Sequence, residues 1–345
     1  MPRRSMGDNG TTLKAKMDGN RSEPTGSHPL IRSSIVPAGC LVLLLAAGLC
    51  ASTPPGNVFW LVDETSAQSA EAGMVMICPS HKHGAIDQAI EKLDGLLGER
   101  PQGALSSVWV CRGQQLETIA LVAPRVSQIV TNPFVNDPPN TALPPHDAWP
   151  QVDHPLIHQL RRIRVTAGER TRVLACINLD GEKHRFDGRR PTVEELEWMH
   201  FAAIGAHYQG IVWRADHKPG ERLHRLQNAL VRRAAPLGRA RPVNWLRPAR
   251  GLQASALATR ETLFICLLHP KVMTLTHEGK VKLPLGVPAR AQSVEVALPP
   301  GVRVEQVESL LGDDVSWRSK ASGVVIDYTL KRGGDMLIAK LKRGD

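Results

Sequence analysis

Residues 188–214 have the sequence GRRPTVEELEWMHFAAIGAHYQGIVWR, and this stretch decides the fold class. Thr192 and Glu195 have the spacing of a capping box, in which the threonine hydroxyl accepts from an early helix amide and the glutamate bonds back to the cap. Apolar residues then recur at helical spacing, and the run Gly210–Trp213 has the composition of a buried strand. A helix followed by such a strand is the repeating unit of an α/β protein.

Short apolar runs of the same kind begin at residue 57 and alternate with amphipathic segments. This alternation is typical of strands that are buried on both faces and covered by helices. Two further helices are predicted, over 85–97 and 222–235, because their apolar residues fall on one helical face. The predicted strands are Val58–Val62, Met74–Cys78, Val108–Cys111, Val126–Thr131, Val173–Ile177 and Gly210–Trp213.

After residue 250 the apolar period changes to two, which indicates an antiparallel β-sandwich. The predicted strands of this part are Leu263–Leu268, Ser293–Leu298, Val302–Val307, Gly323–Leu330 and Asp335–Lys340. Alternation predicts a sandwich core of Phe264, Cys266, Val294, Val296, Val325 and Leu337, with Ile326 and Tyr328 on the opposite face. The chain of 345 residues is therefore divided into an N-terminal region (1–52), an α/β part (53–250) and a sandwich (251–345).

The N-terminal region resembles an export signal. Six Lys or Arg residues precede the apolar run LVLLLAAGLCA at residues 41–51, which is too short for a permanent membrane span. We expect cleavage after Ser52 and a periplasmic or extracellular protein; a retained signal anchor or a buried apolar strand are the alternatives. Four cysteines would remain, and an oxidising compartment permits but does not require disulfides among them. They are Cys78, Cys111, Cys176 and Cys266.

The formal net charge of +10 is concentrated in two places, with +3 in residues 1–52 and +8 in residues 214–250. A nucleic-acid-binding surface more often combines spread basic residues with aromatic ones. The arginines of 222–235 fit a solvated helix face, so we expect no nucleic-acid partner. No nucleotide, serine-hydrolase or zinc-protease motif is present, and no third ligand is spaced to join His81 and His83. We therefore expect no cofactor and no metal.

Residues 188–199 and 201–214 resemble the late helices and strands of (β/α)8-barrel glycoside hydrolases, in which an R-x-P-T-x-E-E helix start precedes a G-I-x-W strand. The final stretch 324–338 is similar to the small β domain that follows such barrels, and the resemblance covers 57–345. It implies a (β/α) barrel, a C-terminal sandwich and a carbohydrate partner. Only six strand-helix units can be counted, and residues before 57 leave no room for more. The expected barrel is incomplete, with its front missing.

Glycoside hydrolysis needs two carboxyl groups, one acting as acid and the other as nucleophile or base. Asp63 and Glu64 follow the first predicted strand, and the resemblance implies that Glu64 is the general acid. Asp180 and Glu182 follow the strand where the resemblance places the nucleophile. A solvated loop pair at 63–64 and a plain turn at 180–182 are the alternatives.

The remaining expected contacts are substrate-binding residues at strand ends. Sugar sites place aromatic faces against the ring, and Trp213 is the first candidate for such a platform. The expected set is Trp60, Asp63, Asn132, Asn178, Trp213 and Arg214. The predicted function is hydrolysis of glycosidic bonds by an exported protein. The alternative is a catalytically inactive carbohydrate-binding or surface-structural protein, favoured by the missing barrel units.

Overall fold

The fold was analysed in a computed structural model. It describes residues 60–63, 74–77, 90–91, 93–95, 107–110, 115–134, 155–179, 188–214, 220–233, 235–247, 253–275, 280–284 and 286–344. Among these residues, no helix combines the length and the apolar character needed to cross a membrane.

Six parallel strands form one sheet in the order β1-β6-β5-β4-β3-β2, so the first strand pairs with the last and the others follow in sequence. The prediction located each of them to within a few residues. The longest, β5, is buried at its five central positions because both faces of the sheet are covered. The strands are β1 (Trp60–Asp63), β2 (Met74–Ile77), β3 (Ser107–Val110), β4 (Gln128–Thr131), β5 (Arg172–Asn178) and β6 (Gly210–Arg214).

Helix α5 (Val193–Gly205) begins with the predicted capping box. The Thr192 hydroxyl accepts from the Glu195 amide at 3.2 Å, and the Glu195 carboxylate accepts from the Thr192 amide at 2.7 Å. Helix α6 (Glu221–Arg233) confirms the prediction for 222–235, and residues 90–91 and 93–95 are helical within the segment predicted at 85–97. Helices α2 (Gln115–Val122) and α3 (Pro155–Ala167) were not predicted. Short 3₁₀ turns occupy Ala123–Arg125 (η2) and Ala235–Arg239 (η4).

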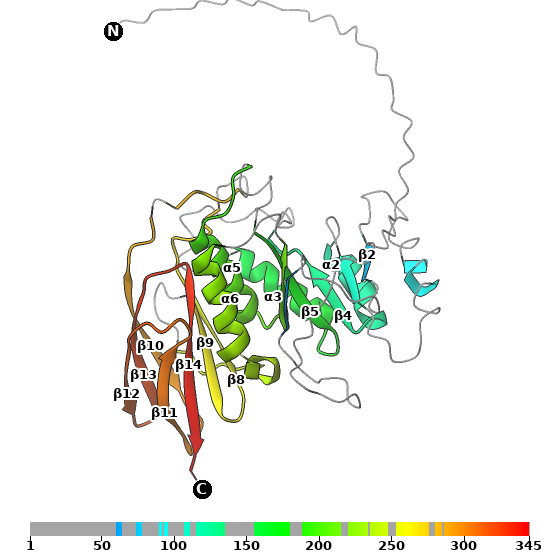
Figure 1. The fold of residues 1–345 in the computed structure, drawn as a ribbon. Helices are drawn as coiled ribbons and strands as arrows, with labels where there is room; N and C mark the ends of the chain where they lie inside the picture. The colour runs from blue at the N-terminus through cyan, green and yellow to red at the C-terminus, as the bar shows by residue number, and fades with distance from the viewer. Residues whose placement is uncertain are drawn as a thin grey trace, which may run out of the picture.

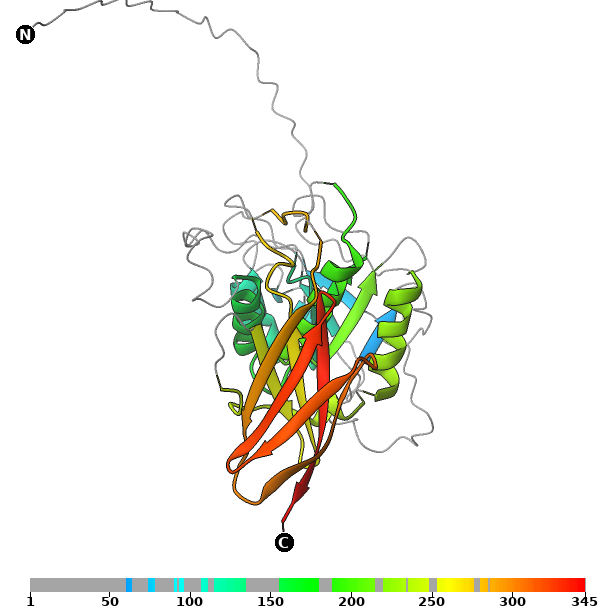
Figure 2. The ribbon, with the colours of Figure 1, turned by 90° about the vertical axis from the view of Figure 1, so that its left-hand side faces the viewer.

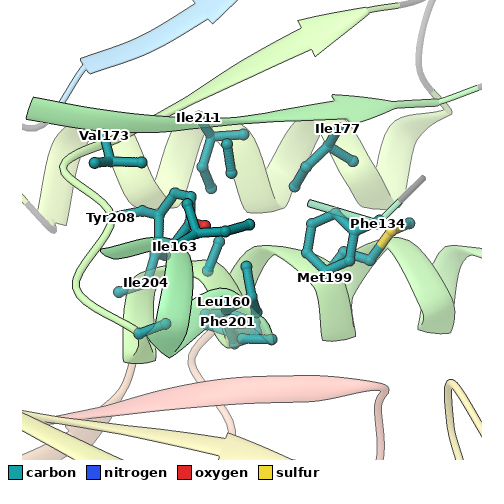
Figure 3. Packing of buried hydrophobic residues seen from close by; sticks show 14 of the residues in the cluster. Phe134, Leu160, Ile163, Val173, Ile177, Met199, Phe201, Ile204, Tyr208 and Ile211 are labelled. Atoms are coloured by element: carbon teal, nitrogen blue, oxygen red, sulfur yellow. The ribbon is translucent and has the colours of Figure 1, made fainter. Parts of the chain in front are cut away.

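One face of the parallel sheet packs on α3 and α5. Alternate residues of β5 and β6 enter this core, whereas the residues between them, such as Leu174 and Val212, are buried outside it. Figure 3 shows the core residues that project from the two strands, namely Val173, Ile177 and Ile211. It also shows the side chains that they meet, among them Leu160, Ile163, Met199 and Tyr208.

The C-terminal part consists of two antiparallel sheets, β10-β13-β12 and β11-β14-β9-β8-β7, that share a second apolar cluster. Its strands begin at Arg241, and Leu246 bridges to Val296, so this part starts before the predicted boundary at 251. The strands are β7 (Arg241–Pro242), β8 (Gln253–Ala258), β9 (Thr262–Leu268), β10 (Arg290–Ala297), β11 (Val302–Ser309), β12 (Val315–Lys320), β13 (Gly323–Leu330) and β14 (Gly334–Arg343).

The predicted core of this part was wrong for β9 and β13. Leu263, Ile265 and Leu267 face the second cluster, whereas Phe264 and Cys266 belong to the core around α5. Both faces of β9 are buried, so alternation identifies the strand but not which face meets which neighbour. On β13, Val324, Ile326 and Tyr328 enter the cluster between the sheets, and Val325 lies on the other face, pairing with Glu295 and Arg318.

Helix α5 lies between the parallel sheet and the five-stranded antiparallel sheet (Figure 1). Two glycines permit the close approach on the second side. A Cβ at Gly205 would overlap the Ser255 hydroxyl, and a Cβ at Gly333 would overlap the backbone carbonyl of Glu194. Turned by 90°, the molecule shows β14 and the sheet around it in front of this helix layer (Figure 2). The two parts therefore share one apolar core.

Candidate functional site

The carboxyl ends of the six parallel strands lie at one edge of their sheet, because parallel strands all run in the same direction. We refer to this edge as the carboxyl edge. Its strand-terminal residues are Asp63, Ile77, Val110, Thr131, Asn178 and Arg214. In a sheet of β/α units, chemistry concentrates where the strands end and the loops begin.

Three of the predicted site residues end adjacent strands at the carboxyl edge. β6 lies between β1 and β5. Arg214 is the register partner of Asn178, and Asp63 is the register partner of Trp213. Neighbouring strands are about 4.8 Å apart, so the Cα atoms of these residues lie within about 10 Å of one another. For Asp63 and Arg214 the structure describes the backbone alone.

The predicted catalytic residues Glu64, Asp180 and Glu182 lie outside the described residues. Their flanking residues are placed, since Glu64 directly follows β1 and Asp180 follows Leu179 at the end of β5. The two predicted catalytic segments therefore leave strands on either side of β6. Trp60 begins β1 opposite Gly210, at the far end of the strand from the carboxyl edge.

Asn132 and Asn178 lie at the carboxyl edge as predicted, and both are half-buried. Asn132 directly follows β4 and is followed by Pro133 and Phe134. The Phe134 ring is buried and lies beside Met199 of α5 (Figure 3). This apolar contact fixes the start of the loop after β4, so the two asparagines are presented from well-packed strand ends.

Trp213 is placed differently from its predicted role as a sugar platform. Its side chain is 7% exposed and belongs to the core on the helix-covered face. The indole N–H donates to Nε2 of His200 at 2.6 Å, and Nδ1 of the same imidazole donates to the Leu196 carbonyl at 2.6 Å. Successive side chains of β6 point to opposite faces of the sheet, and that of Trp213 points to the helix layer. The indole therefore packs against α5 and is not open to a sugar ring.

His200 was missed by the sequence reasoning. Its side chain is fully buried, and burial lowers its pKa to about 4. The neutral ring has one donor and one acceptor, and both are used. A histidine four residues after Leu196 on a buried helix carries no local signal that identifies a tryptophan partner on the next strand. His200 fixes the carboxyl end of β6 against α5.

The segment that enters α5 from the carboxyl edge is held by an ion pair that was also missed. Arg189 donates to both carboxylate oxygens of Glu195, at 2.7 and 2.6 Å, and the Glu195 side chain is completely buried. The same carboxylate completes the capping box at Thr192. One glutamate thus fixes both the helix start and the chain that leads to it.

Metal and thiol chemistry find no support within the part of the chain that the structure describes. No group of three or more His, Cys, Asp or Glu side chains there could hold a metal ion. Cys176 and Cys266 are buried thiols. Burial raises the pKa of Cys266 to about 12, so it stays protonated and unreactive at neutral pH. Cys78, Cys111, His81 and His83 lie outside the described residues.

No family model and no curated protein sequence matches this chain. Solved structures that match it include glycoside hydrolases. An α-amylase from Geobacillus thermoleovorans complexed with acarbose is 12% identical, with 82% of this chain and 61% of that chain covered and a TM-score of 0.46. The α-fucosidase from Thermotoga maritima with a mechanism-based inhibitor is 11% identical, with 75% of this chain and 57% of that chain covered and a TM-score of 0.33. A GH30 endoxylanase from Clostridium papyrosolvens is 8% identical, with 78% of this chain and 65% of that chain covered and a TM-score of 0.41.

The chain spans less than two thirds of the length of each of these structures. Identities and TM-scores this low say nothing about activity. The function is therefore argued below from the residues of this chain.

Proposed function

We propose that this protein hydrolyses glycosidic bonds at the carboxyl edge, using Glu64 as general acid and Asp180 or Glu182 as nucleophile or base. The parallel sheet would then be an incomplete (β/α) barrel, and the two antiparallel sheets would be the sandwich that follows it. The substrate would be a polysaccharide or oligosaccharide outside the cytoplasm.

The strand order is the observation that supports this proposal most. In a closed barrel the first strand pairs with the last, and the remaining strands follow in sequence. The six described strands have this order, with one interruption between β1 and β2. An open doubly wound sheet would instead place its first strand in the interior. If the sheet is an incomplete barrel, its missing units would fall at the interruption between β1 and β2.

The spacing of the strands is compatible with a pair of catalytic carboxyl groups. β1 and β5 flank β6, so their ends are about 10 Å apart. Side chains on the segments that follow can approach across β6. Carboxyl groups about 5 Å apart act with retention of configuration, and groups about 6.5–9.5 Å apart act with inversion.

The half-buried Asn178 and the strand-terminal Arg214 suit the recognition of sugar hydroxyl groups. Amide groups both donate and accept hydrogen bonds, as hydroxyl groups do, and guanidinium groups donate. Their backbone positions are register partners at the ends of β5 and β6, which supports a shared role in binding the proposed substrate. Asp63 on the other flank adds a second acceptor, and Asn132 after β4 extends the same edge.

The test is turnover of a panel of soluble polysaccharides by the native chain and by Glu64→Gln. We expect the amide to abolish proton donation and lower turnover about a hundredfold or more. Glu169→Gln is a matched control, because Glu169 is an exposed glutamate in the turn before β5, at the opposite edge of the sheet. Equal turnover by native protein and Glu64→Gln would remove Glu64 from the chemistry.

A second candidate function is carbohydrate binding without catalysis. The specific observation in its favour is that the described residues provide six parallel strands where a complete barrel has eight. This function predicts measurable affinity for a polysaccharide with no turnover, and affinity that Glu64→Gln leaves unchanged.

Export is part of the proposal and is tested separately. N-terminal sequencing of secreted protein should begin between Ala51 and Gly56. Recovery of the intact N-terminus in a membrane fraction would indicate a signal anchor, and its recovery in cytoplasmic protein would contradict export.

A further inference from the structure

The connection between β9 and β10, residues 269–289, leaves the antiparallel sheets to which both strands belong. We call its described residues, 269–275, 280–284 and 286–289, the strap. Figures 1 and 2 show it rising to the end of the molecule where the chain enters α5. That end is the carboxyl edge, because α5 follows β5 and must run back to start β6.

The strap is built into the apolar core and has internal structure. Val272, Met273, Leu275 and Val281 are buried in the same cluster as Phe134 and Leu179, which follow β4 and β5. Leu275 bridges to Val281, and the Lys282 amide donates to the Thr274 carbonyl at 2.8 Å. The strap is therefore a short folded element that shares the apolar core with the residues directly after β4 and β5.

Met273 has a left-handed backbone, with φ at 54°. This conformation is unfavourable for a residue with a long side chain and persists only where surrounding contacts enforce it. The enforcing contacts are the burial of the Met273 side chain and the hydrogen bonds on either side of it. Such strain favours a second arrangement of the strap once one of its restraints is removed.

His269 closes the base of the strap. Its backbone amide donates to the Gly333 carbonyl at 2.9 Å. Its Nε2 donates to the Pro288 carbonyl at 3.2 Å, which ties the start of the strap to its end. Its Nδ1 accepts from the Lys271 amide at 3.2 Å. Because one ring nitrogen must donate and the other must accept, only the neutral imidazole satisfies both partners.

Protonation of His269 would place a second N–H group against the Lys271 amide. That hydrogen bond would be lost, and a charge would appear on a side chain that is 1% exposed. The described charged groups that act on the ring are Arg290 and Lys271, both cationic, and the neighbouring β13–β14 turn offers a backbone carbonyl. Burial and these two cations lower the pKa of His269, so the neutral form prevails at neutral pH.

We propose that the strap is a pH-sensitive wall of the carboxyl edge, held closed by neutral His269 and released when His269 is protonated. Access to the edge would then increase in mildly acidic surroundings. The consequence for substrate access rests on the proposed function, whereas the movement of the strap does not.

The experiment is hydrogen exchange of the full chain without substrate, followed from about pH 7.5 to about pH 4.5 and corrected for intrinsic rates. The reporters are the amides of Lys271, Val272 and Lys282, and the reference is residues 323–343. We expect strap protection to fall about tenfold or more relative to the reference as the pH decreases. Strap protection that follows the reference over the whole range would overturn the proposal, whatever activity assays show.

Two variants assign the effect to the ring. His269→Asn keeps an acceptor oxygen for the Lys271 amide, loses the bond to Pro288 and cannot titrate, so its strap protection should not change with pH relative to the reference. His269→Ala removes the restraint, so its strap should be poorly protected at every pH. If the strap of His269→Asn loses protection with the same pH dependence as the native chain, protonation of His269 is not what releases the strap. If neither variant folds, the native pH series decides alone.

Discussion

Helix α5 faces the parallel sheet with apolar side chains and one neutral histidine, whereas it faces β14 with a buried charge and direct backbone contact. On the first side, His200 accepts the Trp213 indole N–H. On the second side, Glu197 is completely buried, binds Arg222 through both carboxylate oxygens at 2.8 Å, and accepts from the Gly333 amide at 3.1 Å. Both sides are buried, but only the second brings a carboxylate and backbone atoms into direct contact.

The same contrast separates the carboxylates of the molecule. Glu197 and Asp335 are buried with all their oxygens engaged; Asp335 accepts from Ser309, Tyr328 and the Met336 amide. Burial raises the pKa of both carboxyl groups, while their partners act in the opposite direction. Glu197 joins α5 to the turn before β14, whereas Asp335 joins the two antiparallel sheets through Tyr328. The proposed catalytic carboxylates instead follow strand ends, so variants at the two places should have opposite effects on stability and turnover.

The largest effect is expected for Gly333→Ala. Its Cβ would overlap the Glu194 carbonyl, and a backbone atom cannot move aside as a side-chain end can. We expect a loss of about 3 kcal/mol or more in the free energy of unfolding, measured by urea denaturation. Gly220→Ala is the control, because a Cβ there meets nothing within 4 Å. Equal stabilities for the two variants would show that α5 and β14 are not in close contact.

A comparable effect is expected from titration of His200. Its pKa is about 4 in the folded chain and 6.5 ordinarily, so the folded state binds fewer protons. Its contribution is fully present above pH 6.5 and is lost as the pH falls toward about 4, amounting to about 3 kcal/mol. His200→Gln should remove this part of the pH dependence of unfolding, whereas exposed His224→Gln should not. An unchanged pH profile in His200→Gln would contradict the buried neutral ring.

Glu197→Gln should cost about 2 kcal/mol, because it weakens a buried carboxylate contact with a partly exposed arginine. The exposed pair of Glu221 with Arg225 provides the control, and Glu221→Gln should leave the free energy of unfolding almost unchanged. Urea denaturation of both variants checks the difference. Turnover per folded molecule should be unchanged in both variants. A large loss of turnover in Glu197→Gln would indicate that the reaction takes place near Glu197, between α5 and β14, and not at the carboxyl edge.

The smallest change in stability is expected for Glu64→Gln. A conservative change of a group used in proton transfer should alter the free energy of unfolding by less than about 0.5 kcal/mol, although turnover falls strongly. Thermal unfolding and turnover of the same preparation test this pairing. Loss of stability with turnover retained would show that Glu64, like Glu197, supports the fold and takes no part in the reaction.

Sequence patterns located each parallel strand that the structure describes and helices α5 and α6, because their apolar periods and the Thr192 capping box are local signals. Helix α2 was missed because it is only eight residues long and no cap or long apolar period marks it. Helix α3 was missed although Leu156, Leu160 and Ile163 have helical spacing after Pro155. Edge strand β12 was missed because it is largely exposed.

The wrong assignments share one physical cause. A local sequence pattern shows that a side chain is buried, but not which other element it packs against. Both faces of β9 are buried, so alternation could not place Phe264 on the α5 side. Trp213 next to Arg214 looked like an open platform, but its partner is a histidine on the preceding helix. At the candidate site, Asn132 and Asn178 are where the strand ends predicted them, while the roles of Glu64, Asp180 and Glu182 stay predictions.

The most direct test of glycosidic hydrolysis is the carboxyl separation across β6 in a crystal structure with a bound oligosaccharide. The proposal predicts that the Glu64 carboxyl group lies between about 5 and 9.5 Å from that of Asp180 or Glu182, with the sugar between them. A nearest separation greater than about 10 Å, beyond the span that the two roles allow, would contradict hydrolysis by this pair.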